Sequence, residues 1–416
     1  MLADSRNSHP LTFFMRFEIA EQLDALRLED AIKLCCRMHP LLAATIDRRL
    51  GHWVWQLSGP PPSLTIHQPA AYLQSRHDWT FDLRRESGLR ISLANSPNGG
   101  SELWLQIHHS CSDARGVLQF IRDLQAAYDQ SLSEATLQQR ELAARRGLSS
   151  RAVGFSRHVT SYLNPRSPKW DRIWKYFSHR SRPLHPTLSQ ANTVSERQGF
   201  SPAFLSCRLP FENDSWKQRR GQFHNQATLN DSLLSALFQS LAAHQLRNSP
   251  HTVDAWLRIG VPIDMRDRQH APPFACNCSS LVFLDQRISS TQNQDELLHA
   301  VHSEMRHIKH HRLGCVFFDC LAFAHSLPLA MWLAVSDQRC AVSAVASNLG
   351  AVEFSNGAGF TIRKLDFLPP LRPGTTVAVG MSSFNTELSL SMHYDHRMIA
   401  SADAQVLLEQ LSTSMR

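Results

Sequence analysis

One stretch of the chain decides its fold, and it reads Ile107-His108-His109-Ser110-Cys111-Ser112-Asp113-Ala114. An apolar run (103–107) precedes it and an amphipathic run (117–124) follows it. This order predicts a strand, a tight turn and a helix. His109 would stand at the end of a strand, where loops expose side chains for chemistry. The four-residue step to Asp113 lets a short loop fold the carboxylate back beneath the ring, so that His109 can act as a general base.

The motif alone leaves an alternative open. The chain contains 22 histidines, so a pattern of two histidines, three other residues and an aspartate can arise by chance. In that case the two histidines are strand-end residues that bind only water and backbone. The context of the motif has to decide between these interpretations.

The C-terminal end of the chain repeats the same unit. When His109 is aligned with His396, apolar positions coincide: Leu103 with Leu390, Leu105 with Met392, Phe120 with Leu407, Ile121 with Leu408 and Leu124 with Leu411. Such a long interval predicts two related lobes rather than a solenoid. The second unit carries Ala400 where the first has Asp113, and Asp395 where the first has His108. The alternative is that any two amphipathic strand–helix units look this similar.

Length and composition place the chain among globular proteins with two lobes. It has 416 residues, of which 43% are hydrophobic and 19% charged. The net charge of +7 favours acidic or phosphorylated small partners. Because the basic residues form no stripe with interleaved aromatics, nucleic acid is not expected as a partner.

The cysteines and histidines of the sequence form neither a disulfide framework nor a recognisable metal-binding motif. The nine cysteines are odd in number and lack framework spacing, which favours reduced thiols in a cytoplasmic protein. Cys276 and Cys278 stand too close in sequence for an ordinary bridge. Four histidines fall in one predicted helix (294–311), and we interpret them as a solvated face rather than a metal site: His302, His307, His310 and His311.

Targeting signals are not evident in the sequence. The first 25 residues lack the long apolar core of a signal peptide, and the longest apolar stretches are too short to span a bilayer. We therefore expect a cytoplasmic protein without a transmembrane segment, and peripheral membrane contact stays open.

The order of the expected elements predicts an α/β or α+β fold. We expect an N-terminal lobe over 1–185, which carries the motif and ends in a Pro-rich crossover (164–202), and a C-terminal lobe over 186–416 with the degenerate copy. Thr228 or Asn230 is a candidate helix cap. A strand over 257–263 and a turn over 347–350 are also predicted.

Five stretches, taken in order, resemble the condensation-type, chloramphenicol-acetyltransferase-like acyltransferase superfamily, which includes alcohol acetyltransferases, polyketide-associated proteins and plant-type BAHD enzymes. They are His39-Pro40-Leu41-Leu42, the HHxxxD stretch His108 to Asp113, Thr228-Leu229-Asn230-Asp231, Val261-Pro262-Ile263-Asp264-Met265-Arg266 followed by Pro272-Pro273 and Asn277, and Ser347-Asn348-Leu349-Gly350. The resemblance covers about residues 10–416. It implies two lobes, each a mixed β-sheet flanked by helices, with an active-site tunnel between them.

The chain departs from the superfamily pattern at several points. Ala114 stands where these proteins usually have Gly, Ala43 where condensation domains usually carry an Arg, and the DFGWG sequence of the plant enzymes is absent. The partner of Asp113 must therefore come from elsewhere. Arg266 matches the plant-type position and is the predicted partner, followed by Arg268 and Arg37.

The resemblance implies an acyltransferase that moves an acyl group from a thioester to a hydroxyl or amine acceptor without an acyl-enzyme. His109 would be the general base, with Asp113 structural, His108 supporting the loop and Arg266 holding Asp113. Candidates for stabilising the oxyanion are Ser347 and Asn348. No metal or permanently bound cofactor is expected; the co-substrate is acyl-CoA or a phosphopantetheine-linked acyl thioester, delivered in trans, with an acyl carrier protein as a candidate partner.

Three alternatives to this assignment remain. Cys111 could act as a nucleophile with His109 as its base. The chain could be a non-catalytic condensation-like binding or docking module, which Ala114 favours. Water could also replace the acceptor, which would make the protein a hydrolase.

Overall fold

The computed structural model describes residues 5, 9–49, 52–67, 79–97, 99–150, 201–212, 227–266, 274–311, 313–315, 342–355, 357, 359–372 and 374–415. Most of the predicted crossover (164–202) lies outside these residues, as do Arg268, Pro272 and Pro273.

The chain divides into two compact units, each composed of three segments. The first comprises Met1–Ser156, Arg266–Ser279 and Ala351–Pro370; the second comprises Arg157–Met265, Ser280–Gly350 and Leu371–Arg416. Each unit contains a mixed sheet and helices, which confirms the predicted fold class. The predicted boundary at residue 185 lies outside the described residues and stays a prediction. A single boundary does not describe the two segments that the C-terminal half contributes to the first unit.

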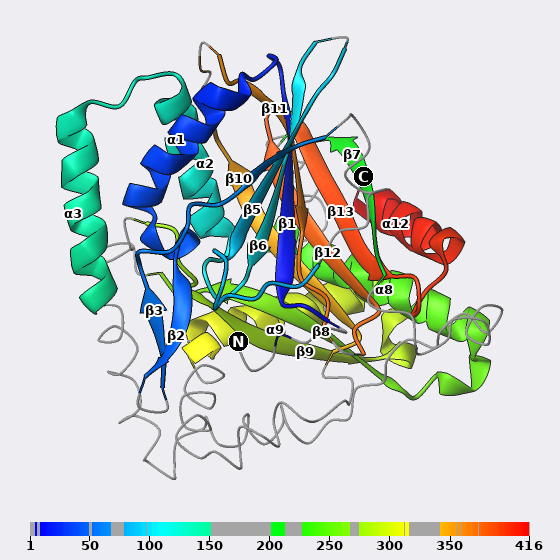
Figure 1. The fold of residues 1–416 in the computed structure, drawn as a ribbon. Helices are drawn as coiled ribbons and strands as arrows, with labels where there is room; N and C mark the ends of the chain where they lie inside the picture. Colours follow the sequence, from blue (N-terminus) through cyan, green and yellow to red (C-terminus); the bar gives the residue numbers. More distant parts are fainter. Residues whose placement is uncertain are drawn as a thin grey trace. The chain divides into compact units, whose positions relative to one another are not determined.

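The first unit is built on a five-stranded sheet with the order β11-β1-β6-β5-β4, and a separate hairpin of β2 and β3 (Figure 1). Its elements are β1 (Thr12–Ile19), α1 (Ala25–Met38), β2 (Thr45–Arg49), β3 (His52–Gln56), β4 (Leu64–Ile66), β5 (Leu89–Asn95), β6 (Ser101–His108), α2 (Ala114–Tyr128), α3 (Glu134–Ser150) and β11 (Ile362–Leu368). Helices α1 and α2 pack against each other on one face of this sheet.

Strand β6 lies at the centre of the first unit. It pairs antiparallel with β1, where Thr12 is opposite His108, and with β5, where Leu89 is opposite Ile107. Its residues from Leu103 to His108 are buried, because both faces of the strand are covered. A central, doubly paired strand is a rigid support for the residues that follow it.

The second unit contains a six-stranded sheet with the order β7-β13-β12-β10-β8-β9. Its elements are β7 (Pro202–Pro210), α8 (Leu229–Asn248), β8 (Trp256–Asp264), β9 (Ser279–Arg287), α9 (Gln294–His310), β10 (Ala344–Val352), β12 (Val377–Phe384), β13 (Glu387–Asp395) and α12 (Ser401–Met415). Helix α8 begins with a capping box between Thr228 and Asp231, which confirms one of the two predicted caps.

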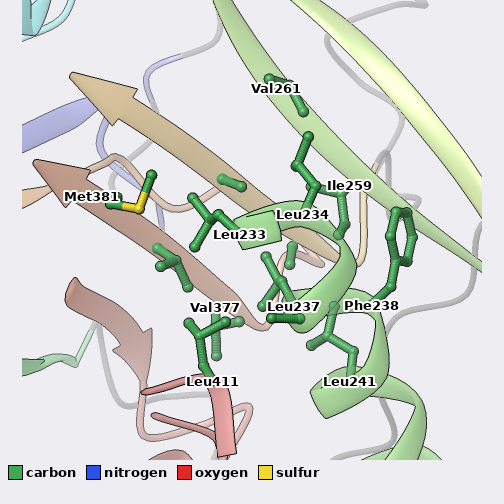
Figure 2. Packing of buried hydrophobic residues seen from close by; sticks show 14 of the residues in the cluster. Leu233, Leu234, Leu237, Phe238, Leu241, Ile259, Val261, Val377, Met381 and Leu411 are labelled. Carbon is green, nitrogen blue, oxygen red and sulfur yellow. The ribbon is translucent and has the colours of Figure 1, made fainter. Parts of the chain in front are cut away.

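Helix α8 supplies one side of the core of the second unit (Figure 2). Its residues Leu233, Leu237 and Phe238 are at most 1% exposed. They pack with Ile259 of β8 and Val377 of β12. Burying each such side chain contributes roughly 1.5–3 kcal/mol, which is why the sheet and helix form one unit.

The predicted repeat exists at the level of secondary structure. Strand β6 is followed by a loop and α2 in the first unit, and β13 is followed by a loop with His396 and α12 in the second. Each strand is paired antiparallel on both sides. The two units therefore each contain a doubly paired strand that leads into a helix with a buried face.

The predicted turn at 347–350 is wrong, because these residues lie inside β10. Ala344, Val345 and Ala346 are buried, and this apolar run continues the strand. The turn-like residues affect the backbone only locally. Gly350 has a φ of 74°, a conformation that favours glycine, and its N–H donates to Oδ1 of Asn348 at 2.7 Å.

Candidate active site

The motif loop begins where β6 leaves the sheet. The His109 N–H donates to the Leu11 carbonyl oxygen at 2.9 Å, and the Cys111 N–H closes a turn on the His108 carbonyl oxygen at 2.9 Å. Asp113 then caps α2, because its Oδ1 accepts from the Gly116 N–H at 2.9 Å. Hydrogen bonds thus fix both ends of a loop of only five residues.

Arg266 and Asp113 form the predicted pair. Nη1 of Arg266 donates to Oδ2 at 2.8 Å and Nη2 donates to Oδ1 at 2.9 Å. The two side chains are only 12% and 8% exposed. A bidentate pair of this kind fixes direction as well as distance. Of the other two candidates, Arg37 instead pairs with Glu141 at 3.0 Å, and Arg268 is outside the described residues.

A short segment, residues 274–279, lies against the motif loop; we call it the strap. Its Cys276 carbonyl oxygen accepts from Nη2 of Arg266 at 2.8 Å, and its Cys278 N–H donates to Oδ2 of Asp113 at 2.8 Å. The close approach requires a glycine on the helix, since a Cβ on Gly116 would lie 3.0 Å from the backbone N and O of Cys276. The strap therefore completes the site from a segment distant in sequence.

Asn277 of the strap contacts the proposed base directly. Its amide Nδ2 donates to the His109 carbonyl oxygen at 2.7 Å and lies 3.0 Å from Nδ1 of the ring. Its Oδ1 accepts from the N–H and the hydroxyl of Ser279 at 2.9 and 2.8 Å, which fixes the direction of the amide. From the sequence, Asn277 was visible only as part of a family motif, without a role of its own.

The contacts of the His109 ring favour a hydrogen on Nδ1. The Ser112 carbonyl oxygen lies 3.2 Å from Nδ1, and a carbonyl can only accept. The Asn277 Nδ2 group could donate to an Nδ1 without a hydrogen. Its shorter hydrogen bond, however, is to the His109 carbonyl oxygen. We therefore assign the neutral tautomer that leaves a lone pair on Nε2. Within the described residues Nε2 has no hydrogen-bond partner.

Burial keeps both histidines of the motif neutral. Desolvation lowers the pKa of His109 below its ordinary value, against the opposing charge of Asp113. Desolvation also lowers the pKa of His108 to about 3, with His109 as a second cause. His108 is 2% exposed and its Nδ1 accepts from the Ser110 N–H at 3.2 Å. This contact fits a supporting role within the loop.

Cys111 is oriented toward a packed region of the first unit. It is fully buried, and a Cβ on Gly88 would lie 2.2 Å from its Sγ. The thiol therefore occupies the space beside Gly88. This packing lends the nucleophile alternative no support.

The remaining predicted site residues lie in the second unit. Ser347 is buried and Asn348 is partly buried, both in β10. His396 is exposed, with Nδ1 3.3 Å from the Ser401 hydroxyl. The roles assigned to Ser347 and Asn348 stay predictions.

The described residues contain no group of three or more His, Cys, Asp or Glu side chains arranged to hold a metal ion. Nor does any helix among them have the length and apolarity needed to cross a membrane. Sγ of Cys276 and Sγ of Cys278 lie 3.4 Å apart.

No family model and no curated protein matches the chain. Solved structures do. TRI3 trichothecene 15-O-acetyltransferase from Fusarium sporotrichioides matches with a TM-score of 0.70 and 14% identity, over 99% of this chain and 92% of that chain. The first condensation domain of the CDA synthetase matches with a TM-score of 0.64 and 14% identity, over 99% and 91%. The X-domain from teicoplanin biosynthesis matches with a TM-score of 0.59 and 17% identity, over 100% of this chain and 91% of that chain.

The chain has the fold of condensation domains. This confirms the superfamily resemblance at the level of the fold, over nearly the whole length of the chain. The proteins that share the fold include an acetyltransferase, condensation domains and an X-domain solved in complex with OxyB. At 14–17% identity this likeness shows the fold alone, so a function has to be argued from the residues at the site.

Proposed function

We propose that the chain is an acyltransferase that moves an acyl group from a thioester to a hydroxyl or amine acceptor. The observation that carries this proposal is the state of His109. Its Nδ1 faces the Ser112 carbonyl, its Nε2 has no hydrogen-bond partner among the described residues, and its loop is held by Asp113 and Arg266. A positioned, neutral imidazole is suited to general-base catalysis, which typically contributes roughly 10²–10⁴-fold to a rate.

The reaction needs one base and no acyl-enzyme. Nε2 of His109 takes the proton of the acceptor O–H or N–H as that atom attacks the thioester carbonyl carbon. The tetrahedral intermediate then collapses, the carbon–sulfur bond breaks, and the departing thiolate recovers the proton from His109. The Ser112 carbonyl stabilises the imidazolium that forms in between. Asp113, Arg266 and His108 hold the loop and touch neither substrate.

The donor in this proposal is acyl-CoA or a phosphopantetheine-linked acyl thioester on a carrier protein. The net charge of +7 suits a phosphorylated donor of either kind. The acceptor is a small alcohol or amine. We further propose a cytoplasmic location and a role for Ser347 and Asn348 as oxyanion contacts.

The test is incubation of the full chain with acyl-CoAs and acyl-phosphopantetheines of several chain lengths, each with alcohol and amine acceptors. Ester or amide product is measured by mass spectrometry, which detects the product itself rather than the released thiol. Product in the wild-type chain and its loss in His109→Ala supports the proposal. Free acid formed equally without an acceptor would instead identify a hydrolase.

A non-catalytic docking module is the second candidate, favoured by the shared fold with an X-domain solved in complex with OxyB. It predicts no product from any donor–acceptor pair. It also predicts that a carrier protein raises the melting temperature of wild-type and His109→Ala chains equally, because the ring would then do no chemistry.

A further inference from the structure

His39 is a buried histidine that the proposed mechanism does not use. It follows α1 directly, and its side chain is fully buried. Both ring nitrogens have partners: Nε2 lies 2.7 Å from Oδ2 of Asp123, and Nδ1 lies 2.8 Å from the backbone nitrogen of Ala275. These partners come from α2 and from the strap, so the ring connects a helix to the segment that carries Asn277.

The two partners define the state of the ring. The Ala275 N–H can only donate, so Nδ1 must be the acceptor and Nε2 must carry the hydrogen that Asp123 accepts. Asp123 does not require a charged histidine, because Arg140 of α3 binds the same carboxylate with two donors. Burial also lowers the pKa of His39. The neutral ring with a bare Nδ1 is thus the form that the surrounding groups stabilise.

The hydrogen bond to Ala275 stands at the start of a continuous series of contacts. Each of the next strap residues also makes a hydrogen bond to the motif loop or to Arg266. The Cys276 carbonyl oxygen accepts from Arg266, the Asn277 amide donates to the His109 carbonyl oxygen, and the Cys278 N–H donates to Asp113. Two residues of chain span at most about 7 Å, so a shift at Ala275 is passed directly to Asn277. Apolar contacts of Phe274 with Leu41 and Ala144 hold the same end of the strap.

We propose that His39 is a positioning residue for His109: its Nδ1 accepts from the Ala275 N–H and thereby sets the position of Asn277 against the catalytic ring. The expected effect on kcat rests on the proposed function. The expected effect on the position of the strap rests on the geometry alone. A protonated His39 cannot accept from Ala275, so the strap loosens at low pH.

The test uses a matched pair of variants. In His39→Asn, the amide oxygen takes the place of Nδ1 and can accept from Ala275. In His39→Gln, the amide nitrogen takes the place of Nε2 and can donate to Asp123, but the acceptor for Ala275 is lost. Both variants remove the ring and one of its two hydrogen bonds, so general packing effects are comparable. Denaturant midpoints of both are measured first.

We expect His39→Gln to lower kcat by roughly 10- to 100-fold, because small misplacements near a reacting group cost rates of this size. KM should stay within about twofold, since the contact acts on the base and not on ground-state binding. His39→Asn should restore kcat to within about threefold of wild type. Equal losses of kcat in both variants, or a loss carried by KM, would overturn the proposal.

Hydrogen exchange separates this inference from the proposed function. Peptides covering 274–279 should be protected in the wild-type chain and in His39→Asn, and exchange faster in His39→Gln, whether or not the chain turns over any substrate. If neither variant folds, the exchange rate of the Ala275 amide in the wild-type chain tests the proposal. A slowly exchanging Ala275 amide supports the proposal, and an amide that exchanges as an open one overturns it.

Discussion

Arg266 holds the carboxylate of Asp113 with two hydrogen bonds, 2.8 Å from Nη1 to Oδ2 and 2.9 Å from Nη2 to Oδ1. The same carboxylate caps α2 through the Gly116 N–H and accepts from the Cys278 N–H. One aspartate therefore joins the motif loop, the helix and the strap. Four hydrogen bonds hold this carboxylate in place, which favours the structural role proposed for Asp113.

Removing either member of this pair should destabilise the protein. We expect Asp113→Ala and Arg266→Ala each to lower the free energy of unfolding by roughly 3–5 kcal/mol, because the remaining charge is buried without its partner. Asp113→Ala should lie at the upper end, since it also removes the helix cap. The double variant should cost less than the sum. Denaturant unfolding measures all three; strict additivity would show that the two residues do not act as a unit.

Replacing the proposed base should abolish chemistry without unfolding the chain. We expect His109→Ala to lower turnover by roughly 10²–10⁴-fold with an unchanged circular dichroism spectrum. His396→Ala is the matched control, because that residue follows the corresponding strand of the second unit and is exposed. A comparable loss in the control, with the fold intact, would mean that the wrong copy was assigned.

The pH dependence of kcat/KM should show an acid limb below pH 6.5. The base works in its neutral form, so activity is present above the pKa of His109 and falls as pH drops through it. Burial lowers that pKa below the ordinary histidine value of about 6.5. Initial rates across the acid range locate the limb, which reports groups of the unliganded enzyme. A limb above pH 6.5 would contradict the assignment of the neutral, desolvated ring.

Gly116 should not tolerate a side chain. A Cβ there would lie 2.4 Å from Oγ of Ser112 and 3.0 Å from the backbone of Cys276. Alanine would gain up to about 1 kcal/mol of helix propensity, but overpacking typically costs about 1–3 kcal/mol. We therefore expect Gly116→Ala to lower the melting temperature. Arg115→Ala, at the exposed neighbouring position, is the control and should change it little.

Much of the fold follows from local pattern. The strand, loop and helix around His109 are set by the apolar run 103–107 and by Asp113 as a cap, and Thr228 was one of two candidate caps of α8. The pairing of Asp113 with Arg266 came from the superfamily resemblance, since a separation of 153 residues has no local signal.

Long-range placement accounts for what the sequence could not predict. Strand β11 joins the first unit, where Leu368 pairs with Phe14 across most of the chain length. Nothing within β11 specifies this partner, because strand pairing is decided by tertiary packing. The same holds for His39 and Ala275, whose hydrogen bond links positions 236 residues apart. At 347–350, burial of the preceding residues overrode a turn-like sequence.

The contact between Asn277 and His109 leads to a prediction with a defined sign. In Asn277→Asp, a carboxylate replaces the amide 3.0 Å from Nδ1. A negative charge at this distance favours the imidazolium, so the pKa of His109 should rise. In the proposed mechanism the neutral ring is the base, so the acid limb of kcat/KM should move to higher pH.

Asn277→Ala provides the comparison for this shift. It removes the hydrogen bond to the His109 carbonyl oxygen without adding a charge. We expect it to lower kcat by roughly 10-fold through looser positioning of the ring, with the acid limb close to its wild-type position. Initial rates across the same pH range measure both variants. If the acid limbs of Asn277→Asp and Asn277→Ala coincide, the residue at 277 does not act on the His109 ring, and the strap contributes only to stability.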